Sequence, residues 1–235
     1  MALSAVKLLN PRVVAQTGPA CTASIIFLHG SGDTGQGIRE WLQMVLGHEL
    51  AFPHIRVVYP TAPARPYTPM MGHQSTVWFN RKKISPFVAE DESVIPMCEK
   101  ISELIDLEIK NGIPFNRIII GGFSMGGCAA LHVGYRFRPS VAGVFGMSCF
   151  LNEKSSVYET LDTSSNLTQW PPLFMSHGKD DSLVLPEWGR VTYNELKSRG
   201  VDSELHMFDN LYHEFNKKTL HLLKSWILKH LPEES

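Results

Sequence analysis

The chain has 235 residues, of which 43% are hydrophobic and 19% charged, and its formal net charge is −1. This near-neutral balance excludes the broad positive surface that binds nucleic acid or an acidic membrane. No apolar stretch reaches the length of a membrane-spanning helix, and the first residues lack a signal-peptide pattern. We therefore expect a cytosolic protein with no nucleic-acid partner and no transmembrane segment.

Apolar runs of strand length alternate with amphipathic runs of helix length along most of the chain. Residues 1–22 are mixed and contain at most a short edge strand. Beyond them the pattern predicts strands at 24–29, 55–59, 118–120, 141–149, 173–177 and 203–208, and helices at 38–50, 91–111, 125–137, 187–199 and 216–231. This alternation predicts a mostly parallel sheet with helices on both faces, in one α/β domain.

Two stretches have no clear period. Residues 60–90 form the longest irregular stretch, and long ordered loops in compact domains are often functional. Residues 151–172 are polar and loop-like, with a weak helical tract. Because the chain is nearly neutral, we interpret the basic triplet Arg81-Lys82-Lys83 as a solvated face rather than a binding patch.

The segment Gly122-Phe-Ser-Met-Gly126 matches the G-x-S-x-G nucleophile elbow. In that motif a sharp turn between a strand and a helix lifts a serine hydroxyl above the sheet. The apolar run Ile118–Ile120 precedes the turn and a run of small residues follows it, as the motif requires. Five matching residues also occur by chance, so the candidate nucleophile Ser124 needs partners elsewhere in the chain.

Polar residues of the right types follow two later strands. Asp180 and Asp181 come after the strand at 173–177, and His213 comes after the last strand. Ligands of open α/β sheets bind at the carboxyl ends of the strands, and the order Ser, Asp, His is that of α/β-hydrolases. An imidazole can take the serine proton while a carboxylate holds its tautomer. We predict a triad of Ser124, His213 and either Asp180 or Asp181.

An enzyme of this type also needs backbone N–H groups aimed at the developing oxyanion. Met125 follows the nucleophile at the start of a helix, where amides are free. The second donor should come from the glycine-rich loop after the first long strand, where Ser31 is the candidate. A phosphate-binding loop is the alternative, but the Gly-Lys-Ser/Thr ending is missing. We interpret Cys128 and Cys149 as packing residues.

Several segments at matching spacing resemble the acyl-protein thioesterase and lysophospholipase family: Phe27–Gly37, Tyr59–Pro63, Trp78-Phe79, Gly121–Gly127, His177-Gly178 with Asp181, and His213. The resemblance runs from about residue 24 to 231 and implies a single α/β-hydrolase domain over residues 1–235. It further implies a cytosolic enzyme that cleaves acyl esters or thioesters, including S-acyl groups on proteins. The family uses no cofactor, so we expect neither a cofactor nor a metal.

The resemblance also assigns individual residues. It places the triad carboxylate on Asp181 and the oxyanion donors on Ser31 and Met125, and it makes Trp78 and Phe79 candidate substrate-binding residues. Related thioesterases carry leucine and glutamine at the two oxyanion positions, but a backbone N–H survives such changes. Losing the apolar side chain at position 31 weakens the case for long acyl chains, because each buried methylene contributes about 0.8 kcal/mol.

The segment between Ser124 and Asp181 is too short to hold a cap domain. We therefore expect an open site bordered by the 60–80 and 151–170 loops. Long-chain depalmitoylation, short-chain ester or lysophospholipid hydrolysis, and a catalytically silent binding module on the same fold remain open readings of the sequence.

Overall fold

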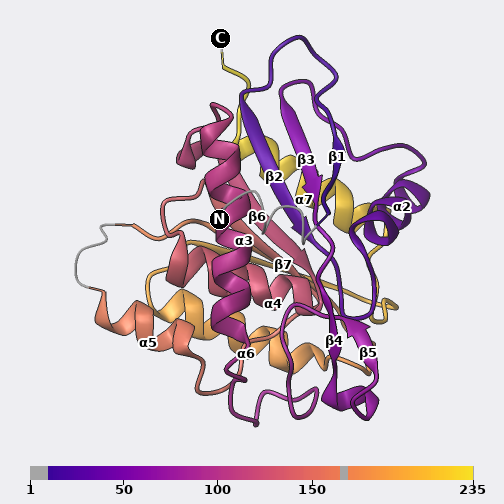
Figure 1. Ribbon diagram of the computed structural model, residues 1–235, viewed down its shortest axis with the longest axis vertical. Helices are drawn as coiled ribbons and strands as arrows, with labels where there is room; N and C mark the ends of the chain where they lie inside the picture. Colours follow the sequence, from indigo (N-terminus) through magenta and orange to yellow (C-terminus); the bar gives the residue numbers. More distant parts are fainter. Residues whose placement is uncertain (1–9, 165–168, 235) are drawn as a thin grey trace.

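The computed structural model describes residues 10–164 and 169–234, so the expectations for residues 1–9 and for 165–168 lie outside the described part. Seven strands form one sheet in the order β1-β3-β2-β6-β7-β8-β9 (Figure 1). The strands are β1 (Arg12–Val14), β2 (Ala23–Leu28), β3 (Ile55–Tyr59), β6 (Ile118–Phe123), β7 (Gly143–Met147), β8 (Leu173–Gly178) and β9 (Ser203–Phe208). Among the described strands of this sheet, the edge strand β1 alone is antiparallel to its neighbour, so the sheet is mostly parallel, as the sequence pattern predicts.

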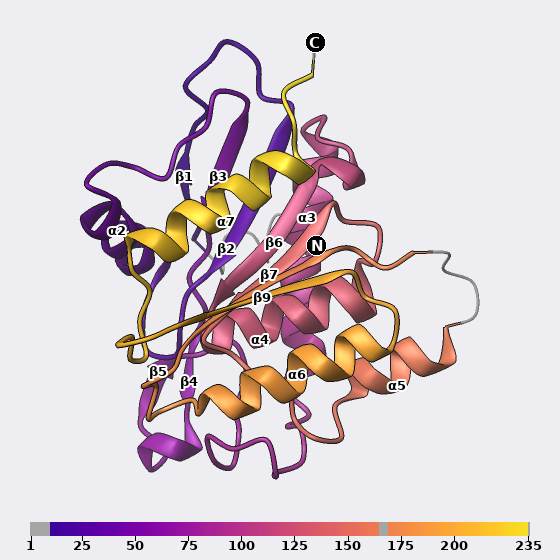
Figure 2. The ribbon, with the colours of Figure 1, turned by 180° about the vertical axis from the view of Figure 1, so that it is seen from behind.

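Helices cover both faces of the sheet (Figures 1 and 2). One face carries α2 (Gly35–Leu46) and α7 (Lys217–His230), and the other carries α3 (Val94–Lys110), α4 (Met125–His132), α5 (Ser156–Thr163) and α6 (Pro186–Ser198). Along β2, Ile25 and Phe27 pack with the first pair of helices, whereas Ile26 and Leu28 pack with the second group. Burial on both faces explains why this strand is a continuous apolar run.

The expected irregular stretch at 60–90 contains structure that the sequence did not reveal. β4 (Ala64–Pro66) and β5 (Gln74–Thr76) pair as an antiparallel hairpin around the 3-10 turn η1 (Thr68–Met70). Strands of three residues are too short to display an alternating pattern, and the prolines around them argue against a strand. The hairpin lies at the foot of the molecule in Figure 1 and carries the buried side chain of Tyr67.

Two helical expectations also change in detail. The helix expected at 125–137 ends at His132, and residues Val133–Phe137 continue as a π-helical turn closed by the Arg138 N–H on the Val133 carbonyl at 2.8 Å. The weak helical tract in 151–172 is α5, which the Ser155 side chain caps by accepting from the Val157 N–H. Within the described ranges, no helix combines the length and apolarity needed to cross a bilayer.

The start of α4 packs directly on the backbone of β2. A Cβ on Gly126 would lie 2.2 Å from the Leu28 carbonyl oxygen, and a Cβ on Gly122 would lie 2.4 Å from the same atom. Real side chains do not approach backbone atoms so closely. The two glycines of the elbow motif therefore let the strand, the turn and the helix pack closely together. This close packing fixes the position of Ser124 above the sheet.

We expect Gly126→Ala to destabilise the fold by at least about 3 kcal/mol, because a methyl group there must displace the backbone of a central strand. The control is Gly112→Ala, where φ is 94° and nothing lies within 4 Å of an added Cβ. That change strains the backbone alone and costs about 1–2 kcal/mol. Urea denaturation measures both variants, and equal losses would show that the Leu28 contact is unimportant.

Candidate active site

Ser124 sits at the turn between β6 and α4 with φ 55° and ψ −120°. This backbone conformation is rarely populated by residues other than glycine and persists only where the surroundings enforce it. The Ser124 N–H donates to the Met147 carbonyl at 2.8 Å, and its own carbonyl accepts from the Cys128 N–H at 3.1 Å. The strained turn therefore holds the hydroxyl at the carboxyl end of the sheet.

The structure brings Ser124, His213 and Asp181 together in a hydrogen-bonded row. His213 Nε2 lies 3.0 Å from Ser124 Oγ, and His213 Nδ1 lies 2.7 Å from Asp181 Oδ2. The three residues come from the ends of β6, β9 and β8. Asp180, which local sequence reasoning could not separate from Asp181, is exposed, and its N–H donates to the Leu211 carbonyl.

Asp181 is buried and surrounded by donors. Burial by itself would raise its pKa, but hydrogen bonds from His177, His213 and the Val184 N–H outweigh that effect and hold its pKa well below the usual range. Asp181 is thus a carboxylate at neutral pH. A carboxylate can only accept, so His213 carries its proton on Nδ1 and leaves Nε2 free to take the Ser124 proton.

His177 is a supporting residue that sequence reasoning did not identify. Its Nε2 lies 2.8 Å from the Val184 carbonyl and 3.3 Å from Asp181 Oδ2, and the ring is buried. These contacts tie the end of β8 to the loop that follows it. The sequence did place His177 in a segment that carries the family resemblance, four residues before Asp181, but no role was assigned to it.

The two expected oxyanion donors flank Ser124. Met125 is the first residue of α4, so its N–H has no acceptor within the helix. Ser31 belongs to the loop after β2, and the neighbouring Gly30 is so close that an added Cβ would lie 3.5 Å from the Ser124 Cβ. The loop and the helix terminus therefore meet beside the hydroxyl, where an oxyanion hole would have to lie.

Buried hydrogen bonds hold the loop after β2 in place. The Ala62 N–H donates to His29 Nε2 at 3.0 Å, so His29 Nδ1 carries the proton and donates to the Gly30 carbonyl at 2.6 Å. Trp78 Nε1 donates to the His29 carbonyl at 2.8 Å. Trp78 and Phe79 are both buried in the core, and neither lines a pocket beside Ser124. They lie behind the loop, away from the expected substrate contact.

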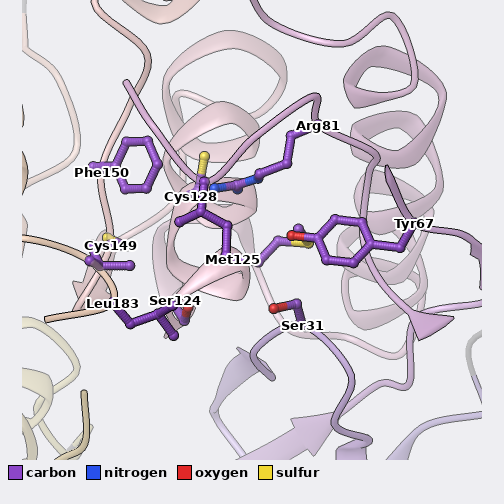
Figure 3. Close-up of a pocket in the computed structure, with 11 residues that line it drawn as sticks. Ser31, Tyr67, Arg81, Ser124, Met125, Cys128, Cys149, Phe150 and Leu183 are labelled. Carbon is purple, nitrogen blue, oxygen red and sulfur yellow. The ribbon is translucent and has the colours of Figure 1, made fainter. Parts of the chain in front are cut away.

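Two pockets meet at Ser124. The first is narrow, with a cavity volume of about 20 Å³, and runs from Ser31 and Met125 to Tyr67, Arg81 and Phe150 (Figure 3). The second is wider, with about 250 Å³, and is lined by Asp33, Trp41, Phe123 and His213 among others. Leu183 lines both. The expected border at 151–170 is wrong for these pockets: the loop after β8 takes its place, and no described residue of 151–170 lines either one.

The profile of the phospholipase/carboxylesterase family matches residues 9–231. The chain belongs to this family. Mouse lysophospholipase-like protein 1 is 53% identical over 96% of the chain and 94% of its own length, and acyl-protein thioesterase 1 homolog 2 of Dictyostelium discoideum is 34% identical over 90% and 94%. Among solved structures, Zea mays acyl-protein thioesterase 2 superposes with a TM-score of 0.81 at 26% identity, covering 94% of this chain and 98% of the maize protein. These matches confirm the α/β-hydrolase fold and the family expected from the sequence.

One residue of this carboxylesterase-family chain lies far from its expected place. Arg81, interpreted from the sequence as part of a solvated face, turns inward and lines the first pocket (Figure 3). Its guanidinium carbon lies 5.0 Å from the centre of the Phe79 ring and 5.3 Å from that of Phe150. Lys82 and Lys83 are exposed, as expected. The sequence of a basic triplet does not reveal that one of its three side chains points into a pocket while the other two face solvent.

Cys128 and Cys149 also line this pocket but are inert. Burial raises the pKa of Cys128 to about 12 and that of Cys149 still further, so neither forms the thiolate that a nucleophile requires. Their role is packing, as expected. Among residues 10–164 and 169–234, no three His, Cys, Asp or Glu side chains are grouped to hold a metal ion.

The buried His29 predicts a pH-dependent stability. Burial lowers its pKa from 6.5 to about 4, against the opposing effect of its bond to Gly30. Below pH 6.5 the unfolded chain takes up a proton that the native side chain does not, so the free energy of unfolding falls as the pH drops toward 4. This residue contributes a slope of about 1.4 kcal/mol per pH unit.

Urea denaturation between pH 7 and pH 5 measures this slope. His29→Gln, which has no titratable group, should lower the stability at pH 7 and reduce the dependence on pH. A variant whose slope equals that of the wild type would contradict the assignment of the proton uptake to His29.

Proposed function

We propose that this chain is a serine esterase that hydrolyses esters of short acyl groups through an acyl-enzyme on Ser124. The proposal rests on one observation: the pocket beside Ser124 has a polar end, which is lined by Arg81 and Tyr67. A long acyl chain gains about 0.8 kcal/mol per methylene only where it is buried against apolar surface. A pocket closed by these two groups favours a chain of few carbons.

The first half of the proposed reaction forms the acyl-enzyme. Ser124 Oγ attacks the acyl carbon while its proton passes to His213 Nε2, 3.0 Å away. The negative charge that develops on the carbonyl oxygen is stabilised by the N–H groups of Ser31 and Met125. His213 then gives its proton to the leaving alcohol as the carbon–oxygen bond breaks, and Asp181 stabilises the imidazolium throughout.

In the second half, water replaces the alcohol. His213 takes a proton from the water as its oxygen attacks the acyl carbon, and the bond to Ser124 Oγ breaks with return of the proton to the serine. One ester and one water thus give one acid and one alcohol.

Each of the two pockets holds one portion of the substrate. The leaving oxygen must come within reach of the His213 ring, and His213 lines only the second of the two. The alcohol portion therefore occupies the pocket of Trp41 and Asp33, and the acyl portion occupies the pocket of Tyr67 and Arg81. The Dictyostelium and maize relatives are named acyl-protein thioesterases. A short S-acyl group presented on a protein is compatible with this division, since no element among residues 10–164 and 169–234 forms a cap over the site.

The state of the cysteines supports a proposal for the cellular compartment. All four cysteines, Cys21, Cys98, Cys128 and Cys149, are unpaired. Free thiols persist in reducing surroundings, which supports a cytosolic location.

Hydrolysis of a series of oxygen esters and matched thioesters, from acetyl to palmitoyl, tests the acyl preference. We expect the highest kcat/KM at short chains and a fall of at least about tenfold by ten carbons, because forcing methylenes into a filled pocket costs about 1–3 kcal/mol. Ser124→Ala should abolish turnover and labelling by a fluorophosphonate probe. Undiminished rates at palmitoyl would support depalmitoylation instead, and an unlabelled wild-type serine would support a silent binding module.

The neighbouring aspartates provide a matched pair of variants. Asp181→Asn should lower kcat by at least about a thousandfold, because an amide can hold His213 in the wrong tautomer. Asp180→Asn should change kcat little, since its side chain is exposed. Circular dichroism of both variants controls for folding. A larger loss at position 180 would overturn the assignment of the triad carboxylate.

A further inference from the structure

Within the described ranges Arg81 has no carboxylate partner, unlike several other arginines of the chain. Arg39, Arg56, Arg117, Arg138, Arg190 and Arg199 each lie within ion-pair distance of an acidic side chain. None of the ion pairs among the described residues includes Arg81. Its Nε is buried and has no hydrogen-bond partner there. At least one of the five donors of this guanidinium is therefore unused, in the pocket beside the reacting serine.

Arg81 is half-buried, and the protein groups around its guanidinium are weak partners for a charge. The rings of Phe79 and Phe150 provide cation–π contacts at 5.0 and 5.3 Å, and Cys128 is a weak acceptor. The carboxylate of Glu90, whose charge also reaches Cys128, accepts bonds from the hydroxyls of Ser155 and Ser156 instead. Removing a charged group from water without a partner is costly. A ligand anion in the pocket would supply the missing partner.

Polar groups on the opposite wall complete the pocket. Tyr67 and Ser31 line the pocket together with Arg81. Figure 3 shows the Arg81 side chain extending into the pocket toward Cys128, with Tyr67 on one side and Phe150 on the other. Ser124 lies at the near end of the same space. The pocket thus runs from the nucleophile to a guanidinium, with a hydroxyl available beside it.

We propose that Arg81 binds a carboxylate at the far end of the acyl group, so that the preferred substrates are half-esters or half-thioesters of short dicarboxylic acids. The inference rests on the proposed esterase function and names its substrate class. The planar guanidinium suits a carboxylate because two parallel N–H donors match its two oxygens. The reaction is the hydrolysis described above, and the free carboxylate takes no part in bond making.

Two esters of matched shape test the proposal. Monoethyl succinate ends in a carboxylate, and ethyl 4-methylpentanoate carries an isopropyl group of similar shape in its place. Acid release at pH 7.5 in a pH-stat gives kcat/KM for each. We expect the wild type to prefer the charged ester by about 10- to 100-fold, the range of a charge-assisted hydrogen bond to a partly buried group.

Three variants test whether the preference for the charged ester depends on Arg81. Arg81→Met should lower the ratio of charged to neutral kcat/KM by about 10- to 100-fold, and Arg81→Lys should restore part of it. Lys82→Met removes the same charge from the next position, whose side chain is exposed and lines neither pocket, and should leave the ratio unchanged. Hydrolysis of the neutral ester by Arg81→Met shows that this variant is folded.

A binding measurement tests the same point without turnover. Succinate should raise the thermal midpoint of the wild type more than butyrate does at equal ionic strength, and Arg81→Met should lose this difference. A charged-to-neutral ratio unchanged by Arg81→Met, with no specific effect of succinate, would overturn the carboxylate subsite while leaving the esterase standing. Failure to hydrolyse either ester, with no labelling of Ser124, would instead defeat the esterase proposal.

Discussion

The contact between the start of α4 and the backbone of β2 is the constraint on which the rest of the site depends. The Leu28 carbonyl lies so close to Gly122 and Gly126 that neither position has room for a side chain. Because α4 begins this close to β2, the chain that leads from β6 into α4 must turn sharply, and Ser124 is held at a positive φ. The same closeness brings the loop after β2 against the serine, so nucleophile and candidate oxyanion donors are positioned together.

Around this contact, buried histidines with fixed hydrogen bonds to backbone groups provide rigidity. His29 joins Gly30 to Ala62, and His177 joins the end of β8 to Val184. Because both partners of His29 are main-chain groups, its tautomer is determined by the fold and does not depend on a side-chain rotamer. The strained serine is thereby supported from two sides by groups that lie in the interior of the protein.

The sequence contained enough information to predict the sheet, most helix bounds and the residues of the candidate triad, because parallel strands deliver their carboxyl ends to one edge. Local pattern could not separate Asp180 from Asp181, since the difference lies in which side chain turns inward to meet donors from β9 and its own loop. It also failed at Arg81, which lines a pocket, and the resemblance did not reveal that Trp78 is buried in the core. Both follow the short hairpin, and where such a loop returns to the core is decided by tertiary packing.

The position of Leu183 has a consequence for how selectivity can change. This half-exposed side chain lines both pockets, so it forms the partition between the two portions of a bound ester. A substitution there alters two cavities at once, and tolerance for a bulkier alcohol cannot be separated from tolerance for a bulkier acid. Directed evolution of this scaffold would therefore find the two preferences linked at position 183, and independent at Trp41 and Phe150, which each face only one of the two cavities.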